Sequence, residues 1–295
     1  MYQSIEEYLD ALKNEMKDAD PALVQDAQAD AREHLTLALK ASKDKEPDVS
    51  EADALNAVID GYGSPEETAS AYREVERRTS PVLNPAVKQR SFLGDFFGVY
   101  TDPRAWGALL YMLIAFVTGV FYFTWAVTGI SVSVSFLIFI FGFPLALLFL
   151  ISIRGLALLE GRLVEALLGV RMPRRPLFTH QGMKWLERLK ALVMDRQTWL
   201  MILYMLIQFV LGIVYFVSIV TVLSISLSFI AIPVLQEVFD QGAFMISDGL
   251  RYTFPTWTYP LWVLGGFLLW TIFMNIVRGV GQLHGRLAKW ILVGE

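Results

Sequence analysis

WGALLYMLIAFVTGVFYF at residues 106–123 and WLMILYMLIQFVLGIVYF at residues 199–216 decide the fold of this chain of 295 residues. The two stretches align without gaps at a constant offset of 93, and Tyr-Met-Leu-Ile recurs unchanged at 111–114 and 204–207. Each is apolar over about 20 residues, the length that an α-helix needs to cross a hydrocarbon core of roughly 30 Å. A membrane unit is therefore predicted to occur twice.

The end of this unit also repeats, but at a different offset. Arg154-Gly155 recurs as Arg278-Gly279, and the Gly-Arg-Leu at 161–163 recurs at 285–287, an offset of 124. The second copy therefore carries about 31 extra residues, at roughly 234–258. Each copy crosses the membrane an even number of times. Both copies then have the same orientation, and the duplication is parallel rather than inverted.

Four spans are expected from the apolar stretches: Ala105–Val127, Val132–Ile153, Thr198–Val220 and Tyr259–Val277. A further apolar stretch at 223–235 leaves the start of the fourth span open, near 222 or near 259. The composition agrees with a membrane protein, since 55% of the residues are hydrophobic and the mean hydropathy is +0.46.

Two serine-rich stretches, SVSVS at 131–135 and SISLS at 224–228, alternate as β-strands do. An isolated strand in lipid would leave its backbone groups unpaired, which is strongly unfavourable. We therefore expect both stretches at the hairpin corner that leads into the next helix. Pro144 and Pro233 are expected to kink or end helices nearby.

The first 80 residues form a different, acidic region, with 19 acids and 9 bases. Helices are predicted at about 5–16 and 21–40, after Ser50 and after Ser64. Asp20 is placed to cap the second helix, with Pro21 at its first position. Ser64 and Glu67 have the spacing of a capping box. The acidic side chains are expected to form a solvated face, with a docking surface for a basic partner as the alternative.

Lys and Arg predict the orientation. Of the 16 bases after residue 80, 15 precede the first span, lie between 154 and 196, or follow 277, and only Arg251 falls in a segment placed outside. Cytoplasmic loops are enriched in these residues, so both termini are expected in the cytoplasm of a multi-pass protein of the cell (inner or plasma) membrane. The predicted domains are a helical signalling domain at 1–80, a linker at 81–90, and membrane copies at 91–176 and 177–295.

Amphipathic stretches flank the spans and are expected to lie in the membrane interface. Their apolar stripes are Phe92, Phe96, Val99 and Tyr100; Trp185, Leu189, Leu192 and Val193; Leu156, Leu159, Leu163 and Leu167; and Leu283, Leu287 and Trp290. The predicted fold class is therefore all-α: a small helical domain joined to a four-span membrane domain with flanking interfacial helices.

No pattern in the sequence indicates catalysis. The absence of cysteine excludes disulfides and thiol chemistry, and the chain has no Walker loop, GxSxG or HExxH motif. His34, His180 and His284 have no second ligand at metal spacing, and surface or interfacial roles are expected for them. The spans lack the mid-depth charges that mark ion pathways. We predict a protein that is not an enzyme and holds no cofactor or metal.

Mildly polar and aromatic residues are the candidates for ligand or lipid contacts. Gln208 and Asn275 lie in the third and fourth spans, where interhelical hydrogen bonds or a cavity lining would explain them. Tyr252, Phe254 and Trp257 lie in the outside segment, for membrane-surface packing or for a lid over a lipid or envelope ligand. Candidates for cytoplasmic coupling are Arg154, Glu160, Arg162, Arg278 and Arg286.

Two family resemblances rest on quoted residues. IEEYLDALKNEM at 5–16, AREHL at 31–35 and EADALNAVIDGYGSPEETASAY at 51–72 resemble the HAAS type of bacterial helical signalling domain. Arg154-Gly155, Glu160-Gly161-Arg162 and LGVRMP at 168–173 resemble a sensor domain of bacterial and archaeal membrane signalling proteins. The second copy lacks the LGVRMP tail.

The resemblance implies membrane signalling beside a PadR-like transcription regulator or a histidine kinase. No kinase module follows the second copy, so output is expected to pass to a separate protein. The leading hypothesis is a non-enzymatic sensor that relays lipid or envelope state, including envelope stress, to a cytoplasmic regulator. The alternatives are a lipid or small-molecule permease, or a membrane subunit of one, and a scaffold for an envelope complex. Membrane lipids are expected partners, homo-oligomers are permitted, and direct nucleic-acid binding is not expected.

Overall fold

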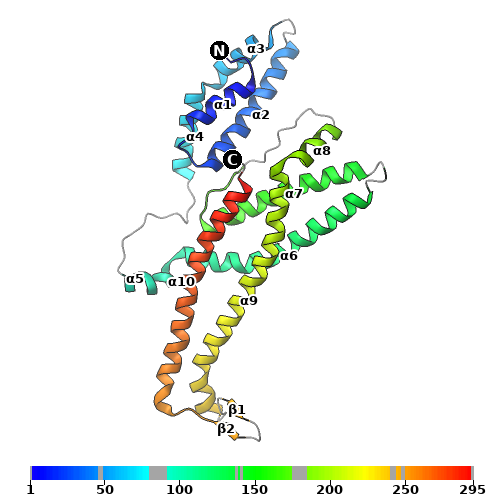
Figure 1. Cartoon of the computed structure of the whole chain (residues 1–295). Coiled ribbons are helices and arrows are strands. Elements are labelled where there is room, and N and C mark those ends of the chain that lie inside the picture. Colours follow the sequence, from blue (N-terminus) through cyan, green and yellow to red (C-terminus); the bar gives the residue numbers. More distant parts are fainter. Residues whose placement is uncertain are drawn as a thin grey trace. The chain divides into compact units, whose positions relative to one another are not determined.

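The computed structural model describes residues 2–45, 49–79, 92–136, 139, 142–174, 185–239, 244–246 and 250–293, nearly all of them helical (Figure 1). Within these residues the only strands are β1 (Phe244–Ile246) and β2 (Leu250–Tyr252), which pair antiparallel. The predicted all-α class is confirmed. The linker at 81–90 and His180 lie outside the described residues.

Four helices form the N-terminal module: α1 (Ile5–Glu15), α2 (Pro21–Lys45), α3 (Glu51–Tyr62) and α4 (Pro65–Thr79). Their starts confirm the predicted caps. The Ala22 amide donates to Asp20, and Ser64 and Glu67 exchange the two hydrogen bonds of a capping box. Helix α2 continues five residues beyond the predicted end at Lys40.

The core of the module comes from apolar residues at helical spacing, which bury one stripe of each helix. Tyr8, Leu12 and Leu35 are among the fully buried side chains. The Tyr8 hydroxyl donates to the Gly63 carbonyl at 2.9 Å and lies 3.0 Å from the Thr68 hydroxyl. Burial raises the pKa of Tyr8 above its ordinary value.

Four helices are long and apolar enough to cross a membrane: α6 (Pro103–Phe136), α7 (Gly142–Leu168), α9 (Arg196–Phe239) and α10 (Tyr259–Leu292). Shorter helices precede the first and third of them: α5 (Phe92–Phe97) with a 3-10 turn at Gly98–Thr101, and α8 (Trp185–Met194). A 3-10 turn at Thr256–Thr258 leads into α10. The predicted four-span membrane-type fold is confirmed.

The structure corrects several details of the spans. The serine stretches at 131–135 and 224–228 lie inside α6 and α9, not at a corner, because Ser135 and Ser228 bond to carbonyls four residues earlier. The second span begins at Gly142 rather than at 132, and the fourth begins near 259. The stripes at 156–167 and 283–290 are parts of α7 and α10, not separate interfacial helices.

The two prolines behave differently. Pro144 lies in the first turn of α7, where a missing amide proton is tolerated, whereas Pro233 lies inside α9, which continues to Phe239. The contacts of the chain group into two compact units. Unit 1 comprises residues 1–85, 124–205 and 285–295, and unit 2 comprises residues 86–123 and 206–284.

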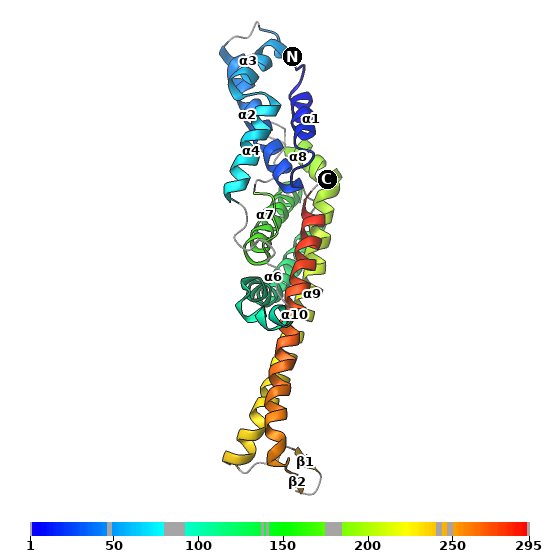
Figure 2. The same cartoon turned by 90° about the vertical axis from the view of Figure 1, so that its left-hand side faces the viewer.

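Unit 2 contains the crossing of α6 and α9. A Cβ on Gly119 would lie 2.7 Å from the Gln208 carbonyl oxygen, and one on Gly212 would lie 2.5 Å from the Ala115 oxygen. Stacked aromatic pairs flank the crossing, Phe116 with Phe216 and Phe123 with Phe209. Helices α9 and α10 also run side by side here (Figures 1 and 2), and a Cβ on Gly266 would lie 2.6 Å from the Ser226 oxygen.

Candidate functional site

The most highly charged contact of unit 1 joins the N-terminal module to the extended segment that follows α7. We call residues 171–174 of that segment the strap. Arg171 Nε donates to both carboxylate oxygens of Glu76 on α4, at 3.0 and 3.1 Å. Its NH2 group donates to Asp26 on α2 at 2.9 Å, and its side chain is only 7% exposed. A nearly buried guanidinium is therefore held by carboxylates from two helices.

The second arginine of the strap strengthens this joint. The backbone N–H of Arg174 donates to Asp26 at 2.6 Å, and its guanidinium donates to Glu165 at the end of α7 at 2.7 Å. The hydrogen bond that Arg174 donates to Glu165 raises the pKa of Arg174, which stays charged. Gly169, with φ of +71°, lets the chain leave α7 and enter the extended strap.

The ends of the long helices carry two ion pairs of the same kind. In unit 1, Arg154 on α7 forms an ion pair with Asp195 before α9 and donates to the Thr198 hydroxyl at 3.1 Å. In unit 2, Arg278 on α10 lies 3.4 Å from Asp102 before α6 and 3.1 Å from Asp95. Arg278 and Arg154 are 124 positions apart, and Asp195 and Asp102 are 93 positions apart. Positions related by the two sequence offsets thus make corresponding contacts.

Tyrosines at corresponding positions also bond to corresponding residues. In unit 1, the Tyr204 hydroxyl donates to Glu160 at 3.2 Å. In unit 2, the Tyr111 hydroxyl lies 2.6 Å from Nε2 of His284, the residue 124 positions after Glu160. The two acceptors therefore differ in chemistry, a carboxylate in one unit and an imidazole in the other.

His284 is the centre of a buried polar cluster in unit 2. Its Nδ1 lies 3.0 Å from the Tyr215 hydroxyl, and Gln208 donates to the Tyr111 hydroxyl at 3.1 Å. Helix α6 supplies Tyr111, α9 supplies Gln208 and Tyr215, and α10 supplies His284. Hydrogen bonds between apolar helices of this kind stabilise their association.

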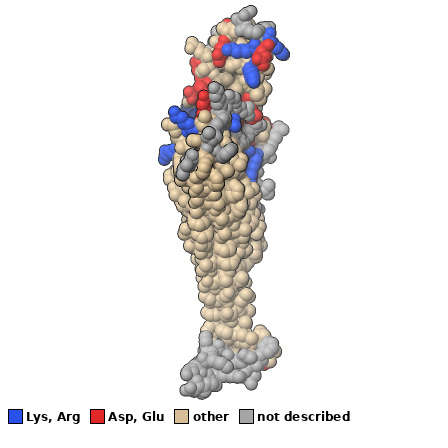
Figure 3. Space-filling view, turned by 90° about the vertical axis from the view of Figure 1, so that its right-hand side faces the viewer, with Lys and Arg blue, Asp and Glu red and all other residues tan. Residues whose placement is uncertain are grey.

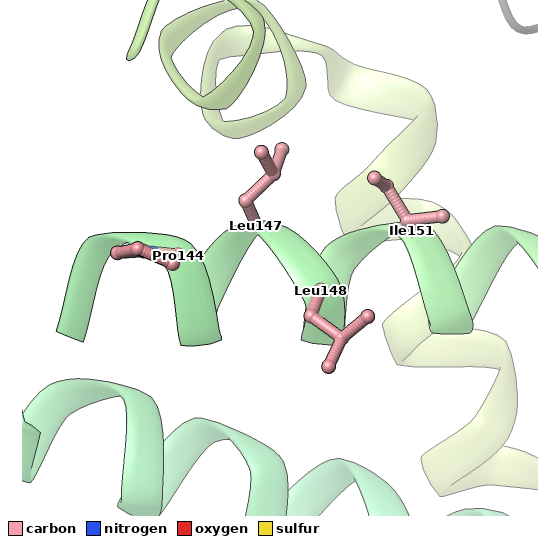
Figure 4. A pocket seen from close by; sticks show the side chains of 4 residues that line it. All are labelled: Pro144, Leu147, Leu148 and Ile151. Carbon is pink, nitrogen blue, oxygen red and sulfur yellow. The ribbon is translucent and has the colours of Figure 1, made fainter. Parts of the chain in front are cut away.

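The surface of unit 1 contains one apolar pocket of about 320 Å³, lined by Pro144, Leu147, Leu148 and Ile151 of α7 (Figure 4). Leu147 and Ile151 point to one side of the helix and Leu148 to the other. No polar side chain lines the pocket, so its chemistry suits an acyl chain. Within the described residues, no group of three His, Cys, Asp or Glu side chains is placed to hold a metal ion.

The family described as "Putative sensor" matches residues 111–292, more than half of the chain. This chain is a member of that sensor family. The match covers α7, α9, α10 and α6 from Tyr111 onward, and both tyrosine contacts lie within it, whereas Asp102 precedes it. No curated protein and no solved structure matches the chain.

The structure places the predicted intramembrane candidates of this sensor-family chain in helix contacts. Gln208 is fully buried in the His284 cluster. Asn275 donates to the carbonyl oxygens of Phe96 and Thr271 and accepts from Arg278. Both residues therefore make hydrogen bonds between helices.

The outside candidates are only partly brought together. Phe254 packs against Trp262 of α10 with ring centroids 4.5 Å apart, whereas Trp257 is 72% exposed. Tyr252 belongs to β2, and its side chain lies outside the described residues. The three aromatic residues do not form one described pocket.

The coupling candidates lie on the second half of α7 and of α10 or near the middle of these helices. Arg154, Glu160 and Arg278 make the paired contacts given above. Arg162 donates to the Arg174 carbonyl at 3.3 Å and lies 3.6 Å from Glu165, beside the strap, while Arg286 lies exposed on α10. On the face shown in Figure 3, the Lys, Arg, Asp and Glu side chains (blue and red) are clustered rather than spread evenly. Residues of other types (tan) cover the rest of the described surface.

Sequence reasoning missed three functional candidates. His284 was expected at a surface or interface, but it is only 3% exposed. Its offset of 124 from Glu160 was a signal that could have found it. Asp26 and Arg171 lie 145 positions apart, and no local pattern links them.

Proposed function

We propose that this chain is a non-enzymatic membrane sensor that relays lipid or envelope state to a separate cytoplasmic regulator. The observation that carries the proposal is the joint between Arg171 and the carboxylates of Asp26 and Glu76. Through it, the segment leaving α7 bonds directly to an acidic helical module. A movement of α7 would therefore change the environment of that module. Membership of the sensor family and the four apolar helices support this role.

The domain organisation follows from the same proposal. The module at 1–80 resembles the HAAS type and would face the cytoplasm, together with both termini. The linker at 81–90 would lead to membrane copies at 91–176 and 177–295, with the insertion at about 234–258 outside. The contacts at offsets of 93 and 124 support two copies of one unit. The chain would then lie in the cell membrane, which in a bacterium with two membranes is the inner one.

The regulator is proposed to be a separate protein, for which a PadR-like transcription regulator is the implied class. In-cell crosslinking and capture of the tagged full-length chain should recover it, and removal of residues 1–80 should abolish that recovery. Arg171→Glu should alter the transcript response to membrane stress, while the amount of the protein in the membrane stays unchanged. Arg32→Glu is the matched control, because Arg32 pairs with the exposed Glu6 at the surface. If removal of residues 1–80 leaves the captured proteins and the transcripts unchanged, the proposal is wrong.

The polar cluster around His284 favours a second candidate function, a lipid or small-molecule permease. A transport path through apolar helices needs polar groups at depth, and Gln208, Tyr111 and Tyr215 supply them. Reconstituted vesicles distinguish the two functions. Flux that Gln208→Leu abolishes would support the permease, and flux equal to that of empty vesicles would exclude it.

A further inference from the structure

Arg171 occupies a pocket whose nearest carboxylates, Asp26 and Glu76, belong to the N-terminal module. Asp26 on α2 and Glu76 on α4 grip its guanidinium from two helices, and Asp26 also accepts from the Arg174 amide. Planar guanidinium groups bind carboxylates in this multidentate way, and ammonium groups do not. The pocket therefore selects arginine, followed by an extended backbone.

The pocket also requires a cation. The Asp26 side chain is 8% exposed and lies beside the core stripe of α2. An ionised carboxylate at such burial is costly unless a charged partner compensates it. The module is therefore stable with an arginine in place, whichever chain supplies that arginine.

The strap has a second partner of its own. Arg171 NH1 lies 3.6 Å from Glu165, which already binds Arg174 at 2.7 Å. Glu165 lies at the end of α7, a few residues before the strap. It would therefore stay close to Arg171 and Arg174 if the strap left the module. With the strap bound, its arginines compensate Asp26 and Glu76. With the strap released, Glu165 compensates the strap arginines, and another arginine can compensate Asp26 and Glu76. Two such arrangements of compensated charge are the property of a two-state element.

We propose that the Asp26–Glu76 pocket is the docking site for an arginine of a basic, extended segment in the cytoplasmic partner. The strap, with its Arg-x-x-Arg spacing at 171–174, occupies this site as an intramolecular competitor. Displacement of the strap opens the site, so the contact is autoinhibitory. The inference rests on the proposed signalling function and names the chemistry of the partner and the regulation of its site.

A peptide with the strap's own sequence, GVRMPRRP from residues 169–176, is the probe. Its affinity is measured by fluorescence anisotropy for the full-length protein in lipid nanodiscs. We expect weak binding to the wild type, because the strap fills the pocket. Arg171→Ala should raise the affinity at least about tenfold, which is a coupling in the range found between competing sites. Arg171→Gln should do the same while it keeps an uncharged polar side chain at this position.

Three controls test the location of the site. Asp26→Asn, added to Arg171→Ala, should abolish the gain, and a peptide with alanine in place of its first arginine should not bind. Arg32→Ala should leave the wild-type affinity unchanged. Equal affinity for the wild type and both Arg171 variants, or a gain that survives Asp26→Asn, would overturn the proposal. This assay contains no regulator, so its failure is distinct from a failure to capture one in cells.

Discussion

Gly119 and Gly212 lie on different helices, α6 and α9, and each allows the backbone of the other helix to approach where a side chain would stand. A Cβ on either glycine would lie within 2.7 Å of a carbonyl oxygen of the opposite helix, Gln208 for Gly119 and Ala115 for Gly212. Such approaches are typical of small residues at helix interfaces in membranes.

Gly119→Ala and Gly212→Ala should therefore force the two helices apart and destabilise the protein by about 1–3 kcal/mol. Unfolding in detergent micelles measures the loss. Gly155→Ala and Gly279→Ala are matched controls, because a Cβ at either position meets nothing within 4 Å. Each control should be neutral or stabilise by up to about 1 kcal/mol, since alanine favours helix. Equal losses at all four positions would refute a close crossing.

The two Arg–Asp pairs should differ in their energetic weight. Arg154 has a side chain 7% exposed, whereas that of Arg278 is 21% exposed and its partner Asp95 is 55% exposed. Asp195→Leu should cost about 3 kcal/mol by leaving the buried Arg154 without its carboxylate, and Asp102→Leu should cost about 1 kcal/mol or less, because Arg278 is more exposed and keeps Asp95.

Chemical unfolding of the two variants tests this order. The double variant Arg154→Met with Asp195→Leu should recover much of the lost stability, because an apolar pair replaces an ion pair at little net cost. A larger loss for Asp102→Leu than for Asp195→Leu would contradict the assignment.

His284 should be needed for its hydrogen bonds rather than for its size. His284→Leu would leave the hydroxyls of Tyr111 and Tyr215 without the ring nitrogens, and we expect a loss of about 2–4 kcal/mol. His284→Gln can bond to both hydroxyls and should lose less than half as much. Thermal unfolding distinguishes the two, with His34→Gln in the N-terminal module as a control. Equal stability of the leucine and glutamine variants would show that the hydrogen bonds contribute nothing.

Tyr8 should make the N-terminal module sensitive to alkali. Its raised pKa means that the folded module favours the neutral phenol. The stabilisation is complete below the ordinary tyrosine pKa of about 10 and falls as the pH rises through the higher value of the folded state. Unfolding followed by tyrosine absorbance should show this fall in the wild type, and Tyr8→Phe should lose that component. A wild-type profile flat above about pH 10 would contradict it.

The helices could be predicted from sequence because their signals are local. Caps such as Ser64 with Glu67 and apolar runs of spanning length need no knowledge of distant residues. The predicted helix ends were wrong where local sequence signals conflicted. The serine alternation at 131–135 suggested a break, but Ser135 bonds to the Ser131 carbonyl within a continuous helix, and α6 runs on to Phe136.

The site was harder to predict because its contacts join distant segments. Arg154 and Arg278 were found through the repeat and Glu160 through the family resemblance, and neither gave the partners of these residues. His284 was missed because its charged sequence neighbours suggested an interface, whereas the packing of three helices decides its burial. Asp26 was one of 19 acids in an acidic region, and only its contact with Arg171 distinguishes it.

The ion pairs at the helix ends have a consequence for biosynthesis. Arg154 and Asp195 are 41 positions apart, whereas Asp102 and Arg278 are 176 positions apart. At a translation rate of about 5–20 residues per second, Arg154 waits roughly 2–8 s for its partner, and Asp102 waits roughly 9–35 s. The helices that carry these residues therefore enter the membrane before their ion pairs can form. An insertase or chaperone that shields the early segments would have a longer task at Asp102, just before the first span, than at Arg154.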